Sequence, residues 1–190
     1  MPGGGTAADR SVSGGRGIIT LASDVALVRF QRLVPTAIGD AEVRVRMSVS
    51  AVTTGTGAAM LPSVLLRYVD ASIFYRARLH FGVSGALSVS VTRDVTQIGS
   101  AVSLPYTYTA GAEYEVRVRL TGHQVQMRVW PVGAMEPDSW HLTGTVTASP
   151  IAAGGIGVTA SAFAAMTNAS PQLRFDNFAT SDPESPSARG

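Results

Sequence analysis

Hydrophobic and polar residues alternate with a period of two along several stretches of the chain. In Ala41–Ala51 the odd-numbered positions hold small or apolar residues, and the even-numbered positions hold Glu, Arg or Ser. The same alternation runs through Tyr114–Leu120 and Gln124–Trp130. Because successive side chains of a strand point to opposite faces of its sheet, each stretch predicts a strand with one buried and one polar face.

Shorter patterns of the same kind predict more strands, with glycine-containing turns between them. These strands are expected at Gly17–Leu21, Ala26–Arg32, Val64–Val69, Ile73–Phe81, Ala86–Thr92, Ser139–Val146, Ile156–Ala160 and Leu173–Phe178. Residues 161–170 fit either a short helix or a loop. Many short strands separated by turns predict an all-β fold, an antiparallel sandwich or barrel.

Composition limits the domain count and the chemistry. The chain has 190 residues, 45% of them hydrophobic, which suits one domain. We expect residues 1–16 to be a flexible Gly/Ser-rich lead-in, residues 17–178 to form the β-sandwich and residues 179–190 to be a disordered tail. The sequence contains no cysteine, which excludes thiol catalysis and cysteine metal sites.

Charge and hydropathy exclude further classes of partner. All fifteen basic residues are arginine, the net charge is only +2, and no basic run occurs. We therefore expect no nucleic-acid partner. The N-terminus has no features of a signal peptide, and no apolar run reaches the roughly 20 residues of a membrane span, so no membrane partner is expected either.

A series of short motifs occurs in one order along residues 11–178. They include Ser11-Val12-Ser13-Gly14-Gly15, Leu66-Arg67-Tyr68-Val69-Asp70-Ala71-Ser72, Tyr75-Arg76-Ala77-Arg78-Leu79, Tyr114-Glu115-Val116-Arg117-Val118-Arg119, Arg128-Val129-Trp130-Pro131, Glu136-Pro137-Asp138-Ser139-Trp140 and Arg174-Phe175-Asp176-Asn177-Phe178. In this order they resemble the concanavalin-A-like and laminin-G-like jelly-roll domains of actinobacterial secreted proteins and of phage tail or adhesion proteins.

The resemblance implies an antiparallel β-sandwich of jelly-roll type in a virion or extracellular setting. The function that we expect first is a non-enzymatic adhesion module, a phage tail or surface component that contacts bacterial cell-surface glycan. The alternative is a purely structural virion subunit, a capsid-decorating or tail-stabilising protein that recognises only its neighbours. The strand that commonly opens such domains is missing, so an unpaired edge favours a homo-oligomer or a larger assembly.

Arginines on the polar side of the predicted strands are the first candidates for ligand binding. They are Arg76, Arg78, Arg117, Arg119 and Arg128, with Arg44 and Arg46 in the same phase. If these strands share one sheet, like charges lie side by side, which is unfavourable by a fraction of about 1 kcal/mol per pair, and an anionic ligand would relieve the repulsion. If the two sheets divide the arginines, the cluster disappears.

Aromatic residues and one carboxylate complete the candidate set. Trp130 lies on the polar phase of its strand, where it fits either a sugar-stacking platform or a residue packed under the following loop. Tyr106 and Tyr108 fit either ligand contact or the edge of the core. The resemblance implies a structural calcium ion near the chain ends with Asp176 as a ligand, although calcium needs about six to eight oxygens. No other cofactor is expected.

Catalytic patterns are weak in this sequence. Glycosidases of the resembled fold carry a Glu-x-Asp-x-x-Glu cluster, and the nearest match is Glu113-x-Glu115 with Val118 in the third acidic position. The three histidines lie in separate segments without zinc-ligand spacing. We therefore expect no enzymatic activity and assign no catalytic residue.

Overall fold

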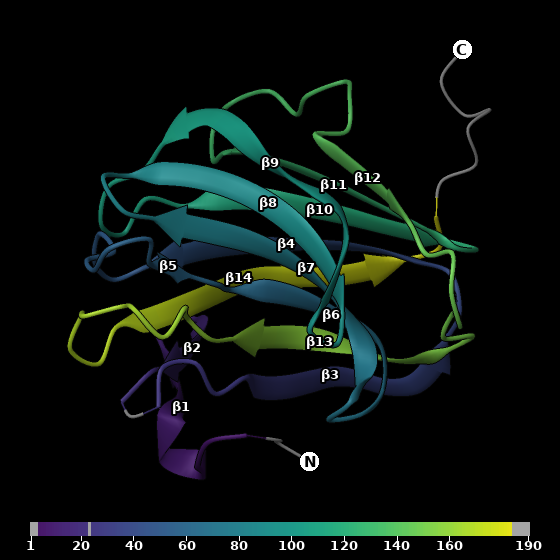
Figure 1. Ribbon diagram of the computed structural model, residues 1–190, viewed down its shortest axis with the longest axis horizontal. Helices are drawn as coiled ribbons and strands as arrows, with labels where there is room; N and C mark the ends of the chain where they lie inside the picture. The colour runs from purple at the N-terminus through teal and green to yellow at the C-terminus, as the bar shows by residue number, and fades with distance from the viewer. Residues whose placement is uncertain (1–3, 23, 184–190) are drawn as a thin grey trace.

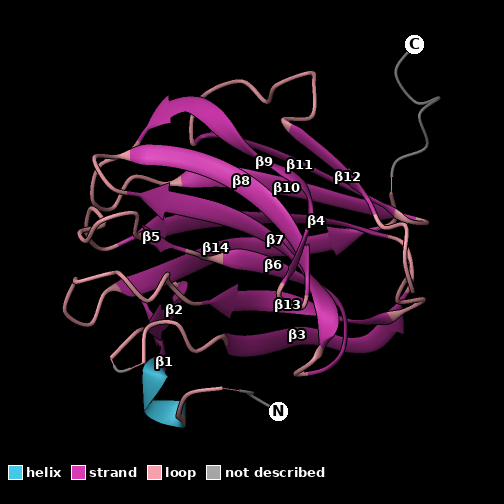
Figure 2. Ribbon diagram, viewed as in Figure 1, coloured by secondary structure: helices cyan, strands magenta, loops and turns pink. Residues whose placement is uncertain are grey.

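The computed structural model describes residues 4–22 and 24–183. Two antiparallel sheets form two layers, and Figure 1 shows one layer in front of the other, with the long strands of both running roughly along the long axis of the molecule. Figure 2 shows that nearly all regular structure is strand, apart from a short helical turn η1 (Ala7–Asp9) near the N-terminus. The prediction of an all-β antiparallel sandwich of jelly-roll type is confirmed.

The first layer, here called the β4 sheet, has the strand order β1-β2-β14-β4-β10-β11-β12. Its strands are β1 (Arg10–Ser13), β2 (Arg16–Thr20), β14 (Gln172–Ser181), β4 (Ala41–Val49), β10 (Tyr114–Thr121), β11 (Gln124–Pro131) and β12 (Leu142–Thr145). The second layer, the β7 sheet, has the order β3-β13-β6-β7-β8-β9, with β5 paired to β7. Its strands are β3 (Arg29–Ile38), β13 (Gly154–Ala160), β6 (Ser63–Asp70), β7 (Ile73–Gly82), β8 (Ala86–Arg93), β9 (Thr96–Thr107) and β5 (Ala59–Met60).

The core lies between the layers and is made from alternate residues of each strand. On β10, Val116 and Val118 are fully buried and oppose Val45 and Val43 of β4. The facing side chains of the β7 sheet include Leu79, also fully buried. Burying such side chains between two sheets is the main source of stability in a sandwich, and it directs every intervening residue to an outer face.

The sandwich extends beyond the boundaries predicted for it. β1 lies within the expected lead-in and pairs with β2, and β14 continues to Ser181, inside the expected tail, because its last residues pair with β4. These strands were not predicted because their sequences are short and polar and lack a hydrophobic alternation. Pairing with the neighbouring strands holds them in the sheet. Residues 1–3 of the predicted lead-in and residues 184–190 of the predicted tail lie outside the described residues.

The structure also decides the form of residues 161–170 and adds a strand that the sequence did not predict. Residues 161–170 contain no helix and connect β13 to β14 as a loop. The strand β9 was not predicted, because Gly99 and Pro105 interrupt its alternation; it is the last strand of its sheet, where a proline costs no ladder hydrogen bond. Within the described residues, the helical content offers no segment of the length and apolarity that a membrane span needs.

Candidate functional site

A strip of polar side chains runs along the outer face of the β7 sheet. Arg76, Arg78 and His80 lie on β7 at every second position, in the phase opposite to the core residues. On β8, Thr92 is the register partner of Arg76, and Ser90 is the partner of Arg78. We call these five residues the arginine strip. The alternation of Ile73–Phe81 positions them, since a strand that buries one set of side chains presents the other outward.

Hydrogen bonds join part of the strip. The Nε of Arg78 donates to the Oγ of Ser90 at 2.9 Å, and the Nε2 of His80 lies 2.7 Å from the same oxygen. Arg76 donates from Nη2 to the backbone carbonyl of Asp94 at 3.1 Å. The Nε of Arg76 and the Oγ1 of Thr92 are buried and have no hydrogen-bond partner among the described residues. Such groups usually mark a place that water or a ligand satisfies.

Aromatic side chains lie at both ends of the strip. At one end the ring of Phe74 lies 5.5 Å from the guanidinium of Arg76 and packs against Phe30 with ring centroids 5.0 Å apart. At the other end Phe163, in the loop after β13, contacts the ring of His80 edge-on at 5.7 Å. Phe163 is 39% exposed, so part of this residue can be contacted from outside the chain.

The protonation equilibria of the strip reflect its burial and its charges. Burial lowers the pKa of Arg76 to about 10, with the charge of Arg78 acting in the same direction and the charge of Asp94 opposing it. Burial, together with the charges of Arg78 and Arg76, lowers the pKa of His80 to about 4. His80 is therefore neutral at pH 7, while both arginines stay charged.

The other predicted arginines lie on the outer face of the β4 sheet. Arg44, Arg117 and Arg128 are register partners on β4, β10 and β11, so three like charges stand in one row. The carboxylate of Glu136, in the loop after β11, forms ion pairs with all three. Glu42 pairs with Arg117 through a hydrogen bond of 2.6 Å from Nε. The repulsion that we expected an external anion to relieve is neutralised within the chain.

Trp130 and Trp140 contact the arginines on the outer face of the β4 sheet. Arg119 donates from Nη2 to Glu42 at 2.9 Å, and its guanidinium lies 5.2 Å from the ring centre of Trp140. Trp130 is only 3% exposed and lies beneath Arg44, 5.5 Å from the guanidinium. That burial leaves the ring of Trp130 closed to a sugar in this conformation.

The two tyrosines belong to the core region. Tyr108 is buried, donates from its hydroxyl to the carbonyl of Gly82 at 2.7 Å and packs edge-on against Phe81. Tyr106 is partly buried against the same core and contacts the ring of His141. Ligand roles for Trp130, Tyr106, Tyr108, Arg117, Arg119 and Arg128 remain predictions, and the structure does not bring these residues to the arginine strip.

The predicted metal ligand, Asp176, lies between an asparagine and an arginine. Asp176 accepts the backbone N–H of Asn177 at 2.8 Å and opposes Arg46 across the β14–β4 pair. In residues 4–22 and 24–183 no three His, Cys, Asp or Glu side chains come together in a way that could hold a metal ion. The carboxylates of Glu113 and Glu115 are engaged with Arg16 and Arg46.

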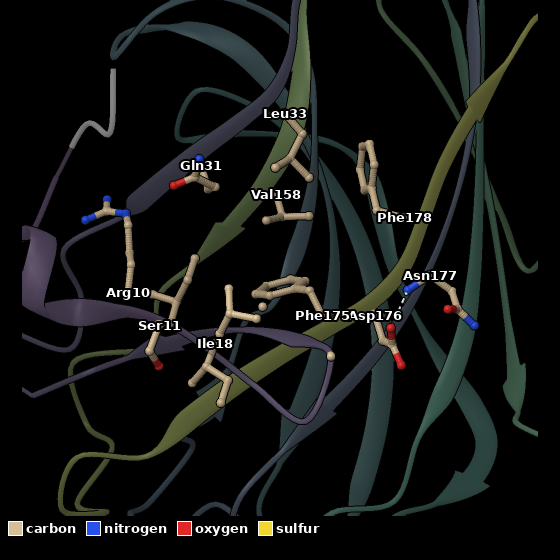
Figure 3. A pocket seen from close by; sticks show the side chains of 14 residues that line it. Arg10, Ser11, Ile18, Gln31, Leu33, Val158, Phe175, Asp176, Asn177 and Phe178 are labelled. Atoms are coloured by element: carbon tan, nitrogen blue, oxygen red, sulfur yellow. Dashed lines mark hydrogen bonds between the residues drawn. The ribbon is translucent and has the colours of Figure 1, made fainter.

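An apolar cavity of about 510 Å³ opens at the side of the sandwich, between β2 and β14 of one sheet and β3 and β13 of the other. Figure 3 shows Ile18, Phe175, Val158 and Leu33 around this space, with the carboxylate of Asp176 pointing away from it. The alternation pattern gave no sign of this cavity, because its walls come from strands of both sheets that are far apart in the sequence.

Sequence reasoning found Arg76 and Arg78 but missed the other members of the strip. His80 looked like an isolated histidine, and Ser90 and Thr92 looked like ordinary polar strand residues. The pairing of β7 with β8 brings them together. The only sequence signal was the shared period of two in two strands joined by a short turn at Ser84-Gly85.

No protein-family model and no curated protein sequence matches the chain. Solved structures do match its fold. A β-glucanase from Bacillus licheniformis is 13% identical with a TM-score of 0.61, over 94% of this chain and 84% of that one. A carbohydrate-binding module from Bacillus subtilis is 11% identical with a TM-score of 0.52, over 96% and 92% of the two chains. An alginate lyase from Klebsiella pneumoniae is 10% identical with a TM-score of 0.54, over 92% and 84%.

These matches correct one expectation. We expected no enzymatic activity, but structures of hydrolases and lyases superpose on nearly the whole chain, so the sequence gives no ground to exclude catalysis. At identities of 10 to 13% the likeness establishes the fold and leaves the activity open. The two stacked antiparallel sheets and the superposed structures together show that this chain has the concanavalin-A-like jelly-roll fold.

Proposed function

We propose that this domain binds a glycan chain along the outer face of the β7 sheet, across the arginine strip. The observation that carries the proposal is a set of polar groups without protein partners, Nε of Arg76 and Oγ1 of Thr92, on a face flanked by aromatic rings. Sugar rings offer hydroxyls to such groups and apolar faces to aromatic side chains. The carbohydrate-binding module among the matched structures supports this reading of the fold.

The test is affinity electrophoresis of the intact chain through gels that contain bacterial cell-wall polysaccharide or plant polyuronate. We expect retardation that is reduced at least fivefold in Phe163→Ala, since the exposed ring is lost while the core is untouched. The matched control is Val95→Ala, which removes an exposed apolar side chain in the turn between β8 and β9. Mobility unchanged by every polysaccharide would overturn the proposal.

Cleavage of the bound glycan is a second candidate, favoured by one observation. His80 is neutral at pH 7 and lies beside two cations. In a β-elimination, a neutral imidazole takes the proton from the sugar carbon next to an acid group, a carbon–carbon double bond forms, and the bond from the neighbouring carbon to the glycosidic oxygen breaks, while guanidinium groups stabilise the negative charge that develops. The proton taken by His80 would pass to the departing sugar oxygen, so the step requires no further reactant.

The appearance of new reducing ends tests this candidate. Polysaccharides that retard the chain should gain reducing ends on incubation, and His80→Gln should abolish the gain while it leaves retardation in place. Retardation without any new ends, over a range of pH values, would remove the candidate and leave binding intact.

The setting of this activity is part of the proposal. We propose that the domain acts on a virion or outside a cell, and that its glycan belongs to a bacterial surface. Retention on whole actinobacterial cell walls, lost in Phe163→Ala, is the expected result. A chain that forms a symmetric oligomer by light scattering and binds no cell wall would instead favour the structural virion subunit.

A further inference from the structure

Arg76 differs from the other buried arginines of the described chain. Five arginines are buried there: Arg29, Arg67, Arg76, Arg117 and Arg128. Four of them pair with a carboxylate of Asp9, Asp40, Glu42 or Glu136. Arg76 is 4% exposed, and no carboxylate of the described residues lies at ion-pair distance from it.

Its neighbours on the sheet supply no negative charge. Leu65 on β6 and Thr92 on β8 are the register partners of Arg76, and Ser63 and Ser90 are those of Arg78. The nearest acid is Asp94, whose carboxylate accepts the backbone N–H of Phe74 at 3.1 Å. Asp94 therefore gives Arg76 a carbonyl contact and a distant charge, without an ion pair.

The burial of Arg76 without a carboxylate lowers the stability of the fold unless an anion from outside the chain supplies the counter-charge. A buried guanidinium without a counter-charge is destabilising, and a second guanidinium two positions along the same strand adds repulsion. Residues two apart on a strand have Cα atoms about 7 Å apart. One anionic group with several oxygens can accept hydrogen bonds from both guanidinium groups over that separation.

We propose that the arginine strip binds the acid group of an anionic glycan, a carboxylate or a sulfate ester, between Arg76 and Arg78. This inference rests on the proposed glycan binding and names the class of glycan. Arg78, which is partly exposed, meets the acid group first, and side chains around Arg76 must shift for the acid group to reach the buried Nε of Arg76 and Oγ1 of Thr92 on the neighbouring strand. Neutral His80 adds no charge of its own at pH 7, so the two arginines set the selectivity.

Paired polymers that differ only in the acid group test the inference. The first pair is polygalacturonate and its carboxyl-reduced form; the second is dextran sulfate and dextran. For intact chain at low salt, we expect at least tenfold tighter binding to the acidic member of one pair, and a loss of that advantage at high salt. The pair that shows the preference identifies the acid group as carboxylate or sulfate.

Variants separate this site from general charge. Arg76→Met and Arg78→Met should reduce the preference for the acidic polymer at least fivefold, whereas Arg174→Met on the β4 sheet should leave it unchanged. Arg174 is a suitable control because it is partly buried and its side chain donates from Nη2 to the side chain of Gln172 at 2.9 Å.

Failure of this inference differs from failure of the proposed function. Equal binding of acidic and neutral polymers, or selectivity retained in both arginine variants, overturns the anionic site and leaves glycan binding in place. Absence of binding to all four polymers and to cell-wall polysaccharide overturns both.

Discussion

The two outer faces of the sandwich differ in whether their buried arginines pair with a carboxylate. On the β4 sheet, Arg117 and Arg128 lie under a loop that brings Glu136 to them, and Glu42 pairs with Arg117 from the neighbouring strand. On the β7 sheet, Arg76 is equally buried but has no acid of its own. Strands of the same alternating pattern build both faces, so the pattern alone does not decide which charge is structural and which is available.

The difference has an energetic meaning. When a buried ion pair forms within the chain, removal of one partner leaves the other charge buried without compensation, and the folded state loses stability. A buried cation without an ion-pair partner contributes nothing comparable to stability, and we propose that an external anion completes it. The four predictions below measure this contrast, from the largest expected effect on stability to the smallest.

Removal of Arg117 should destabilise the protein most. Arg117→Ala leaves the buried Glu42 with Arg119 as its remaining partner and takes one of three cations from Glu136, so the free energy of unfolding should fall by about 3 to 4 kcal/mol. Urea titration measures it. The control is Arg46→Ala, which breaks a more exposed pair with Glu115 and should lower the free energy of unfolding far less, because solvent screens that pair. A cost for Arg117→Ala no larger than that of Arg46→Ala would contradict the structural role of this face.

Titration of His80 should give the next largest effect. Its pKa is about 4 in the folded chain and 6.5 ordinarily, so between these values the unfolded state binds more protons. Stability is therefore fully present above about pH 6.5 and falls as the pH drops toward 4, by at most about 3 kcal/mol at roughly 1.4 kcal/mol per unit. Urea titrations at several pH values should show this loss, and His80→Gln should flatten it.

Other groups act around the same window and need their own control. Burial, and then the charge of Arg128, lowers the pKa of His141 in the same direction, so His141→Gln should remove a separate part of the slope. The pKa of Asp9 is lowered by its hydrogen bond from the backbone of Thr6, and its stabilising contribution disappears only at lower pH, around and below its ordinary value of 3.8. A slope that survives in His80→Gln unchanged would show that His80 is not the buried neutral base described here.

The sequence predicted those parts of the fold in which alternation is regular. Val116 and Val118, with their partners on β4, were expected inside and are inside, since a clean period of two admits one buried face. The strand β9 was not predicted because Gly99 and Pro105 interrupt the alternation. Its extended conformation is fixed by pairing with β8. Local sequence cannot reveal a strand that is held mainly by its partner.

The candidate site was only half predictable for a related reason. The polar phase of Arg76 and Arg78 could be read from the chain, but the sheet on which they lie depends on long-range pairing. Glu136 could not be assigned to the arginines, because it lies in a loop with no periodicity. Which arginines pair with carboxylates on each face could therefore be determined only from the three-dimensional structure.

The aromatic cover of the β4 sheet should contribute less than its ion pairs. The ring of Trp140 lies 4.5 Å from the guanidinium of Arg128 and 5.2 Å from that of Arg119. Trp140→Leu keeps an apolar side chain but removes these cation–π contacts, so the free energy of unfolding should fall by about 1 kcal/mol. Urea titration is again the measure, with Trp140→Phe expected to retain part of the effect. Identical stabilities of the three proteins would show that the cation–π contacts of Trp140 contribute nothing measurable to stability.

The smallest effect on stability should come from the arginine whose loss matters most for binding. Arg76→Met removes an unpaired buried charge while the methionine keeps an apolar stem in place, so the free energy of unfolding should stay within about 0.5 kcal/mol of the parent value or rise above it. Arg117→Met is the matched change on the opposite face and should be strongly destabilising, because Glu42 and Glu136 lose a partner. Parallel urea titrations compare the two. If Arg76→Met were as destabilising as Arg117→Met, the charge of Arg76 would be satisfied within the fold, and the contrast between the two faces would fail.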